Sequence, residues 1–271
     1  MILAFDVGNT ETVAGLFEAG ELLDHWRFST VTERTMDELG LLVRSLVRES
    51  GFDLGPLHAA VIASVVPPVT SNLVDMCEHH LGVQVLVIDA LTPLPIRLEV
   101  DEPLSVGADR IVNTLAAAVL FRRDTVVVDL GTATTFDCIS ADGAFLGGVI
   151  APGVETGAET LVRRTAKLPR VDLSRPDNVI GRRTETALRS GIFNAATSSI
   201  DGIVRRIKDE WGRGDALVVA TGGLAPSLGP HCRTVERIEP YLTLQGLELA
   251  HRHVEETRTG ARLTTVRRAR R

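Results

Sequence analysis

Short apolar runs alternate with segments of helical periodicity along most of the chain. Residues 2–7 and 12–17 each hold an apolar run that is too short for a helix and is typical of a strand. In residues 36–49 the apolar side chains recur every three or four positions, which predicts an amphipathic helix. The same reasoning predicts strands at 22–29, 59–66, 84–88, 125–130, 134–140, 144–150 and 216–220, and helices at 70–81, 107–121, 154–165, 185–211 and 242–253.

One unit of this pattern occurs twice: an apolar strand, an aspartate, a turn with glycine, and a threonine. The first copy ends in Asp6-Val7-Gly8-Asn9-Thr10 and the second in Asp129-Leu130-Gly131-Thr132. Glycine lets backbone N–H groups approach a ligand closely, and a carboxylate can hold a metal ion or its water. The duplication predicts two α/β halves, each with a mixed sheet that begins with three antiparallel strands. We expect the two tips to hold a nucleotide polyphosphate in a cleft between the halves.

The composition narrows the class of protein. The chain has 271 residues, of which 44% are apolar and 24% charged, values ordinary for a globular protein. Its net charge of −6 argues, weakly, against nucleic acid as the main partner. The three cysteines show no C-x-x-C spacing, and no apolar stretch reaches the length of about 18 residues that a membrane span needs. The sequence therefore predicts a cytoplasmic protein without a disulfide framework, a membrane span or a signal peptide.

Several common nucleotide and catalytic motifs are absent from the sequence. The only lysines are Lys167 and Lys208, and neither lies in a glycine-rich loop, so a P-loop is excluded. No G-x-G-x-x-G follows the first strand, no G-x-S-x-G elbow occurs, and the seven histidines show no ligand spacing. Each aspartate tip taken alone is more often a plain turn, because Asp, Asn and Gly favour turns. The matched pair of tips favours the nucleotide site.

Four segments in this order resemble the signature of type III pantothenate kinases. They are Asp6–Thr10, Gly107–Arg110, Asp129–Thr134 and Gly147–Gly153. This family lies within the superfamily of acetate and sugar kinases, heat-shock chaperones and actin. The resemblance implies an α/β fold of two duplicated ribonuclease H-like (actin-like ATPase) domains with a cleft between them. We expect an N-terminal half at 1–120, a C-terminal half at 121–257, and a basic, disordered tail at 258–271.

The resemblance also implies an activity. Members of the family use ATP to phosphorylate pantothenate to 4'-phosphopantothenate, the first step of coenzyme A biosynthesis, as cytoplasmic homodimers that need Mg²⁺ and K⁺ or NH4⁺. Two alternatives stay open for this chain. One is a kinase or phosphohydrolase of the same superfamily with another small substrate, against which residues 107–110 argue. The other is a non-enzymatic relative that binds a nucleotide and acts as a regulator.

Roles for single residues follow from the resemblance. Asp109 is the expected catalytic base, since a carboxylate can orient the attacking hydroxyl and take its proton, although it could also only cap the helix 107–121. Asp6 is the expected Mg²⁺ ligand and Asp129 the expected ligand of the monovalent cation. The expected ATP-binding residues are Asp6, Val7, Gly8, Asn9, Thr10, Glu11, Thr12, Val13 and Thr132, and the expected pantothenate-binding residues are Gly107, Ala108, Asp109, Arg110, Thr184 and Val100.

One position departs from the family pattern. A tyrosine commonly lies a few residues before the Gly-x-Asp-Arg segment, and Val100 occupies that place here. An apolar side chain could still pack against the dimethyl group of pantothenate. Residues 221–223, Thr-Gly-Gly, follow a predicted strand and fit a close backbone approach to the adenosine, although glycine pairs after strands are common.

Overall fold

The computed structural model describes residues 1–260 and divides into two compact units. The first unit contains Met1–Pro95, Leu104–Leu115 and the chain from Leu244 onward, and the second contains Ile96–Pro103 and Ala116–Thr243. The predicted halves at 1–120 and 121–257 are defined by the duplication rather than by compactness, and their boundary stays a prediction. Most of the predicted basic tail, residues 261–271, lies outside the described residues, whereas Arg258 is the last residue of a helix.

The first unit is built on a five-stranded mixed sheet in the order β3-β2-β1-β4-β5. Strands β1 and β2, and strands β2 and β3, pair antiparallel, while β4 runs parallel to β1 and β5 parallel to β4. The three antiparallel strands predicted at the start of the chain are thus present. The bounds are β1 (Ile2–Val7), β2 (Glu11–Glu18), β3 (Glu21–Ser29), β4 (Ala59–Ser64) and β5 (Gln84–Ile88).

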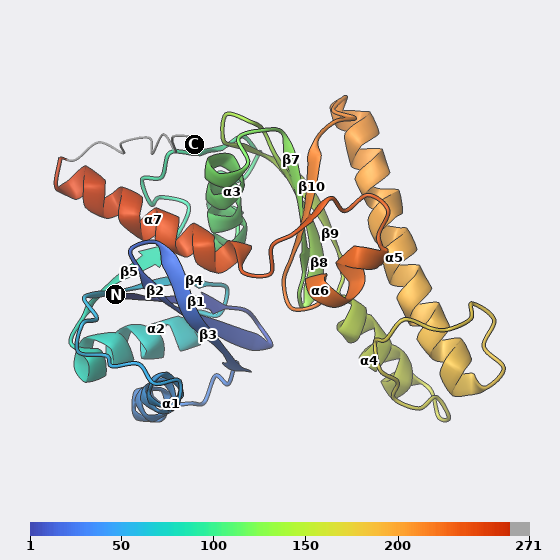
Figure 1. Ribbon diagram of the computed structural model, residues 1–271, viewed down its shortest axis with the longest axis horizontal. Coiled ribbons are helices and arrows are strands. Elements are labelled where there is room, and N and C mark those ends of the chain that lie inside the picture. The colour runs from blue at the N-terminus through green and yellow to red at the C-terminus, as the bar shows by residue number, and fades with distance from the viewer. Residues whose placement is uncertain (261–271) are drawn as a thin grey trace, which may run out of the picture. The chain divides into compact units, whose positions relative to one another are not determined.

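Helices cover both faces of this sheet (Figure 1). Alternate residues of β1, namely Leu3, Phe5 and Val7, belong to the core that α1 and α2 complete. The opposite face carries α7, whose Leu244 lies where a side chain at Gly15 of β2 would be. The bounds are α1 (Met36–Glu49), α2 (Pro67–Met76), a π-helical turn η1 (Cys77–Leu81), a 3-10 turn η2 (Pro103–Ser105), α3 (Ala108–Leu120) and α7 (Leu242–Arg258).

The second unit repeats this arrangement. Its six-stranded sheet has the order β11-β10-β7-β8-β9-β6, and the pairs β7–β8 and β8–β9 are antiparallel while β10 runs parallel to β7 and β11 to β10. Apart from the added edge strand β6, this is the strand order and direction of the first sheet, which confirms the predicted duplication. The bounds are β6 (Arg97–Leu98), β7 (Thr125–Leu130), β8 (Ala133–Ile139), β9 (Ala144–Pro152), β10 (Leu217–Thr221) and β11 (Arg237–Ile238).

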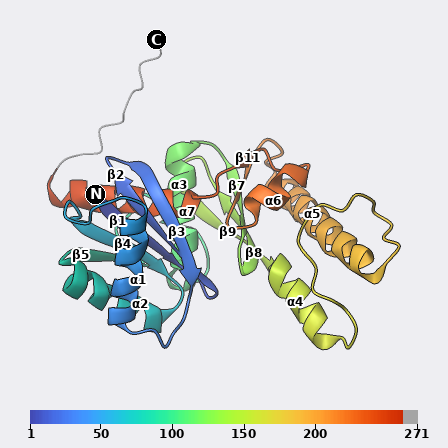
Figure 2. The same cartoon turned by 60° about the horizontal axis from the view of Figure 1, so that its bottom comes forward.

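The second unit contains the longest helix among the described residues. The helix α5 (Thr184–Trp211) runs unbroken through Gly191. A glycine inside a helix costs only about 1 kcal/mol, and the apolar side chains Phe193, Ile200 and Val204 anchor α5 in the core of this unit. The other bounds are α4 (Val154–Arg164), α6 (Ala225–Leu228) and a 3-10 turn η3 (Gly229–His231). Figure 2 shows α4 and α5 in a second view.

Some helix and strand boundaries in the structure differ from the predicted ones. Helix α2 begins at Pro67 and not at Thr70, because proline lacks an N–H that the first turn of a helix leaves unbonded anyway. The preceding strand accordingly ends at Ser64 and not at 66. The two-residue strands β6 and β11 had no signal in the hydrophobic pattern, since each is too short to show a period.

Asp201 of α5 is a buried carboxylate that ties this helix to the chain before β11. It accepts hydrogen bonds from Arg233 N (3.0 Å), Thr234 N (2.9 Å) and Thr234 Oγ1 (2.8 Å). Burial acts to raise the pKa of Asp201, but the bonds from Arg233 and Thr234 outweigh it and the pKa is lowered. Ionised Asp201 therefore stabilises the fold above the pKa of an unfolded aspartate, and this stability is lost as the pH falls through the lowered pKa.

Asp201→Ala is expected to lower the free energy of unfolding by about 2–4 kcal/mol at neutral pH, because two partly buried N–H groups lose their charged acceptor. Urea unfolding measures the change. Asp209→Ala is a matched control on an exposed turn of α5 and is expected to change stability by less than about 0.5 kcal/mol. An Asp201→Ala loss no larger than that of the control would contradict the assignment.

Candidate active site

The first aspartate tip is the turn between β1 and β2. Gly8 N donates to Glu11 O (3.0 Å), which closes the turn, and the hydroxyl of Thr30 donates to Gly8 O (2.8 Å). Asn9, Thr10 and Glu11 are exposed at the tip. The predicted ATP-binding residues of this turn therefore form two groups. One group is exposed at the tip, and the other belongs to the strands that form the framework behind it.

Thr12 and Val13 belong to that framework. Thr12 is fully buried, and its hydroxyl is 2.9 Å from the hydroxyl of Thr30. Thr30 was missed by the sequence reasoning because it lies directly after the third strand, and only the pairing of Glu11 with Ser29 brings it beside the tip. Pairing the three predicted antiparallel strands residue by residue could have found it.

Asp6 and Asp109 lie on the same face of the first sheet and at the same end of its parallel strands. Asp6 alternates along β1 with core residues that face α1 and α2, so its side chain points to the opposite face, where α7 lies. Helix α3 packs on α7, since a side chain at Gly246 would overlap the backbone of Val112.

The start of α3 is held at the edge where β1 and β4 end. Val65 N, directly after β4, donates to Val7 O (3.1 Å), and a Cβ at Gly107 would lie 3.7 Å from Val65 Cγ1. The structure thus brings the predicted base and the predicted Mg²⁺ ligand to one end of parallel strands, the place where α/β sheets commonly bind ligands.

The carboxylate of Asp109 lies at the first turn of α3. Its Oδ1 accepts from Arg110 N (2.9 Å), and a Cβ at Gly107 would come within 2.5 Å of the same oxygen. Glycine at 107 therefore leaves the space that this carboxylate occupies. Burial raises the pKa of Asp109, against the smaller opposing effects of the Arg110 hydrogen bond and charge. A desolvated carboxylate with a raised pKa is a better proton acceptor, which is the property a general base requires.

Asp129, the second aspartate of the duplication, is the last residue but one of β7 and lies beside Gly222, which follows β10. Thr221 pairs with Asp129 across the two parallel strands, and Gly222 has φ +86°. A Cβ at Gly222 would overlap Asp129 Oδ1 and would lie 2.9 Å from the backbone N and C of Leu130. Gly222 therefore leaves room for the Asp129 carboxylate, and the close approach to the adenosine that the sequence suggested stays a prediction.

Thr132 lies at the exposed end of the second turn. Gly131 N donates to Ala133 O (3.1 Å), and Thr156 Oγ1 in the first turn of α4 donates to Thr132 O (2.9 Å). A side chain at Gly153 would overlap the backbone of Thr132. The turn is therefore fixed against the N-terminus of α4, an end of a helix that favours anions.

Val100 and Thr184 lie on other elements of the second unit. Val100 follows the edge strand β6, and a Cβ at Gly147 would lie 3.7 Å from Val100 Cγ1. Gly147 has φ +104°, so this position within β9 favours glycine. Thr184 is exposed and is the first residue of α5.

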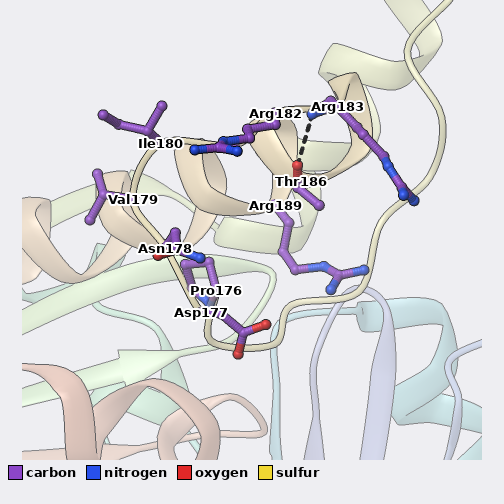
Figure 3. A pocket seen from close by; sticks show the side chains of 10 residues that line it. Pro176, Asp177, Asn178, Val179, Ile180, Arg182, Arg183, Thr186 and Arg189 are labelled. Carbon is purple, nitrogen blue, oxygen red and sulfur yellow. Dashed lines mark hydrogen bonds between the residues drawn. The ribbon is translucent and has the colours of Figure 1, made fainter.

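A pocket of about 630 Å³ adjoins Thr184 and is shown in Figure 3. It lies between residues 176–183 and the first turns of α5, where Arg183 N donates to Thr186 Oγ1 (3.1 Å). Ser190 Oγ donates to Val179 O (2.7 Å) and ties this loop to the helix. The arginines of the pocket, Arg182, Arg183 and Arg189, had not been singled out from the sequence.

Within residues 1–260, no three or more His, Cys, Asp or Glu side chains gather as they would around a metal ion. No helix in that range has the length and apolar character needed to cross a membrane.

Comparison with known families places the chain. A family model described as type III pantothenate kinase matches residues 2–206. The chain belongs to the type III pantothenate kinase family. A type III pantothenate kinase of Moorella thermoacetica is 46% identical over 253 residues, which cover 93% of this chain and 98% of that protein. One of Koribacter versatilis is 42% identical over 259 residues, covering 92% and 94% of the two chains.

Solved structures share the fold at low identity. A Campylobacter jejuni protein assigned to the Baf family of transcriptional activators has a TM-score of 0.56 and 19% identity, covering 94% of this chain and 99% of its own. The activator of the 2-hydroxyisocaproyl-CoA dehydratase from Clostridium difficile, solved with bound ADPNP, has a TM-score of 0.51 and 10% identity, covering 98% and 99%. Together with the matching strand orders of the two sheets, these likenesses confirm the predicted actin-like fold class.

Proposed function

We infer that this chain is a pantothenate kinase that transfers the γ-phosphoryl group of ATP to the primary hydroxyl of pantothenate and yields 4'-phosphopantothenate, the first step of coenzyme A biosynthesis. Family membership over residues 2–206 supports the reaction. The observation that carries the chemistry is Asp109, a carboxylate of raised pKa that shares one sheet edge with Asp6. We place the reaction in the cytoplasm, where ATP is available.

Phosphoryl transfer needs positioning and charge stabilisation more than covalent chemistry. In the proposed mechanism Asp109 orients the attacking hydroxyl of pantothenate and takes its proton. Arg110 binds a polar or anionic group of the same substrate, a task suited to a planar cation with several donors. The exposed residues Asn9, Thr10 and Glu11 and the turn at Thr132 contact ATP.

The donors present fit the metal ions that the family uses. Mg²⁺ is commonly bound by one or two carboxylates together with substrate phosphates, so the single carboxylate of Asp6 suits it. K⁺ or NH4⁺ is assigned to Asp129, whose carboxylate is held in place over Gly222. Bound cations would neutralise phosphate charge.

A coupled assay tests the function. Purified chain, ATP, Mg²⁺ and K⁺ are expected to release ADP only when pantothenate is present. ATP binding without turnover of pantothenate would favour the non-enzymatic alternative, and turnover of another small alcohol in its place would favour a different kinase.

The Asp129 assignment predicts a dependence on the monovalent cation. Activity is expected in KCl or NH4Cl and is expected to be lost in NaCl at the same ionic strength, because the cation proposed for Asp129 is K⁺ or NH4⁺. Initial rates across a KCl series, with choline chloride holding the ionic strength constant, measure it. Equal rates in all three salts would contradict a cation site at Asp129.

The groove between α4 and α5 supports a homodimer. Its volume is about 430 Å³, and it is lined by small and apolar residues that include Gly157, Leu161, Gly191 and Ala195. Leu161 is 42% exposed. Small residues let helices approach closely, so a second copy of this chain is the proposed occupant.

Leu161→Glu is expected to shift the chain from dimer to monomer, because it places a charge in an apolar contact. Sedimentation equilibrium measures the mass. Leu41→Glu is the matched control, since Leu41 is 69% exposed on α1, and it should leave the mass unchanged. A dimer that survives Leu161→Glu would exclude this groove as the interface.

A further inference from the structure

A second polar pocket lies on the second unit, away from the aspartate turn. Its volume is about 470 Å³, and it lies between α5 and the chain that follows α6. Asn194, Thr197 and Asp201 of α5 line it together with three arginines, Arg175, Arg205 and Arg233. No predicted role for the active site uses any of these residues.

The charge of this pocket is positive. All three arginines are exposed, and in residues 1–260 neither Arg175 nor Arg233 forms an ion pair. Asp201 is the one carboxylate among the lining residues, and Arg205 approaches it only to 3.9 Å. Its oxygens already accept from Arg233 N, Thr234 N and Thr234 Oγ1. Asp201 therefore positions the rim more than it neutralises the three guanidinium groups.

The part of the pocket that Arg233 lines is distant from Asp129 along the sheet. Glu236 N donates to Val218 O (2.9 Å), and Arg237 pairs with Val219 of β10. Arg233, which precedes these residues, is therefore level with the start of β10, whereas Asp129 pairs with Thr221 at the end of that strand. This separation makes the pocket distinct from the turn that carries Asp129.

We propose that this pocket binds a compact anion with two or more negative charges. Guanidinium groups form paired hydrogen bonds with phosphate and carboxylate oxygens, and three of them around one pocket match a multivalent anion. The polar side chains Asn194 and Thr197 offer little surface for an apolar ligand body. Phosphate groups and clustered carboxylates share the required chemistry, and the test separates them.

Arginine side-chain NMR on the full chain tests the proposal. The Nε–Hε signals of Arg175, Arg205 and Arg233, assigned through single Arg→Lys variants, are followed while inorganic pyrophosphate is added, and in a separate series citrate. We expect the three signals to shift along one saturable curve. Arg206 is the matched control, because it lies on α5 next to Arg205, donates to Gly202 O and does not line the pocket.

The variant Arg205→Ala/Arg233→Ala completes the test. Both side chains are exposed, so the fold should persist, and an unchanged Tm checks this. The double variant is expected to weaken pyrophosphate binding, followed at Arg175, at least tenfold. Saturation by pyrophosphate alone assigns the pocket to phosphates, and saturation by both anions assigns it to multivalent anions in general. Absence of saturable shifts, or equal shifts at Arg206, would overturn the proposal.

Discussion

Asp109→Asn is expected to lower kcat by a factor of about 10²–10⁴ while the Kd for ATP stays unchanged. The asparagine keeps the size of the side chain and can still accept from Arg110 N, but it cannot take the proton of the attacking hydroxyl. Steady-state kinetics with pantothenate and calorimetry with ATP measure the two effects separately. Asp75→Asn, at an exposed position of α2 in the same unit, should change neither.

The stability of this variant separates catalysis from helix capping. Burial raises the pKa of Asp109, so the folded state favours the protonated form. The stabilisation from that proton is present below the pKa of an unfolded aspartate and is lost as the pH rises through the raised pKa. Asparagine resembles the neutral form, so Asp109→Asn should be at least as stable as the parent chain at pH 7. A lower Tm together with unchanged kcat would mean that Asp109 only caps α3.

Gly222→Ala is expected to have the second large effect. The added Cβ would overlap Asp129 Oδ1 and would require φ +86°, a conformation that costs about 1–2 kcal/mol for a residue with a side chain. The overlap adds to this cost and displaces the Asp129 carboxylate. We expect lower stability and a weaker activation by K⁺.

Gly212→Ala is the matched control for this substitution. Gly212 follows α5 with φ +67°, and nothing lies within 4 Å of the Cβ it would gain. It therefore carries the backbone strain without the contact. Urea unfolding and a KCl titration of the rate measure both variants. Equal losses of stability with unchanged K⁺ activation in both would show that the approach of Gly222 to Asp129 has no functional role.

The duplication was the part of the fold most open to prediction. The two aspartate turns and the strands on either side of them have local signals, because alternating apolar residues and glycine turns are properties of neighbouring residues. The matching orders β3-β2-β1-β4-β5 and β9-β8-β7-β10-β11 follow from that repeat. Strand β6 had no such signal, since it gains its place only by pairing with residues 144 and 145 of β9.

The candidate site likewise has a part that could be predicted from the sequence and a part that could not. Asp6 and Asp109 could be named from their motifs, but that they share one face and edge depends on Val65 and on the packing of α3 against α7, which are contacts distant in sequence. Thr30 was missed for this reason, and the pocket that Arg182, Arg183 and Arg189 line likewise exists only in the folded chain. The burial that raises the pKa of Asp109 is likewise a property of the folded chain.

The most direct measurement of the proposed activity is ³¹P NMR of the reaction product. Parent chain incubated with ATP, Mg²⁺, K⁺ and pantothenate should convert the γ-phosphate signal into the signal of a phosphate monoester on the primary hydroxyl of pantothenate, and Asp109→Asn should not. Release of inorganic phosphate without the ester, or ester formation at the same rate by Asp109→Asn, would contradict the account.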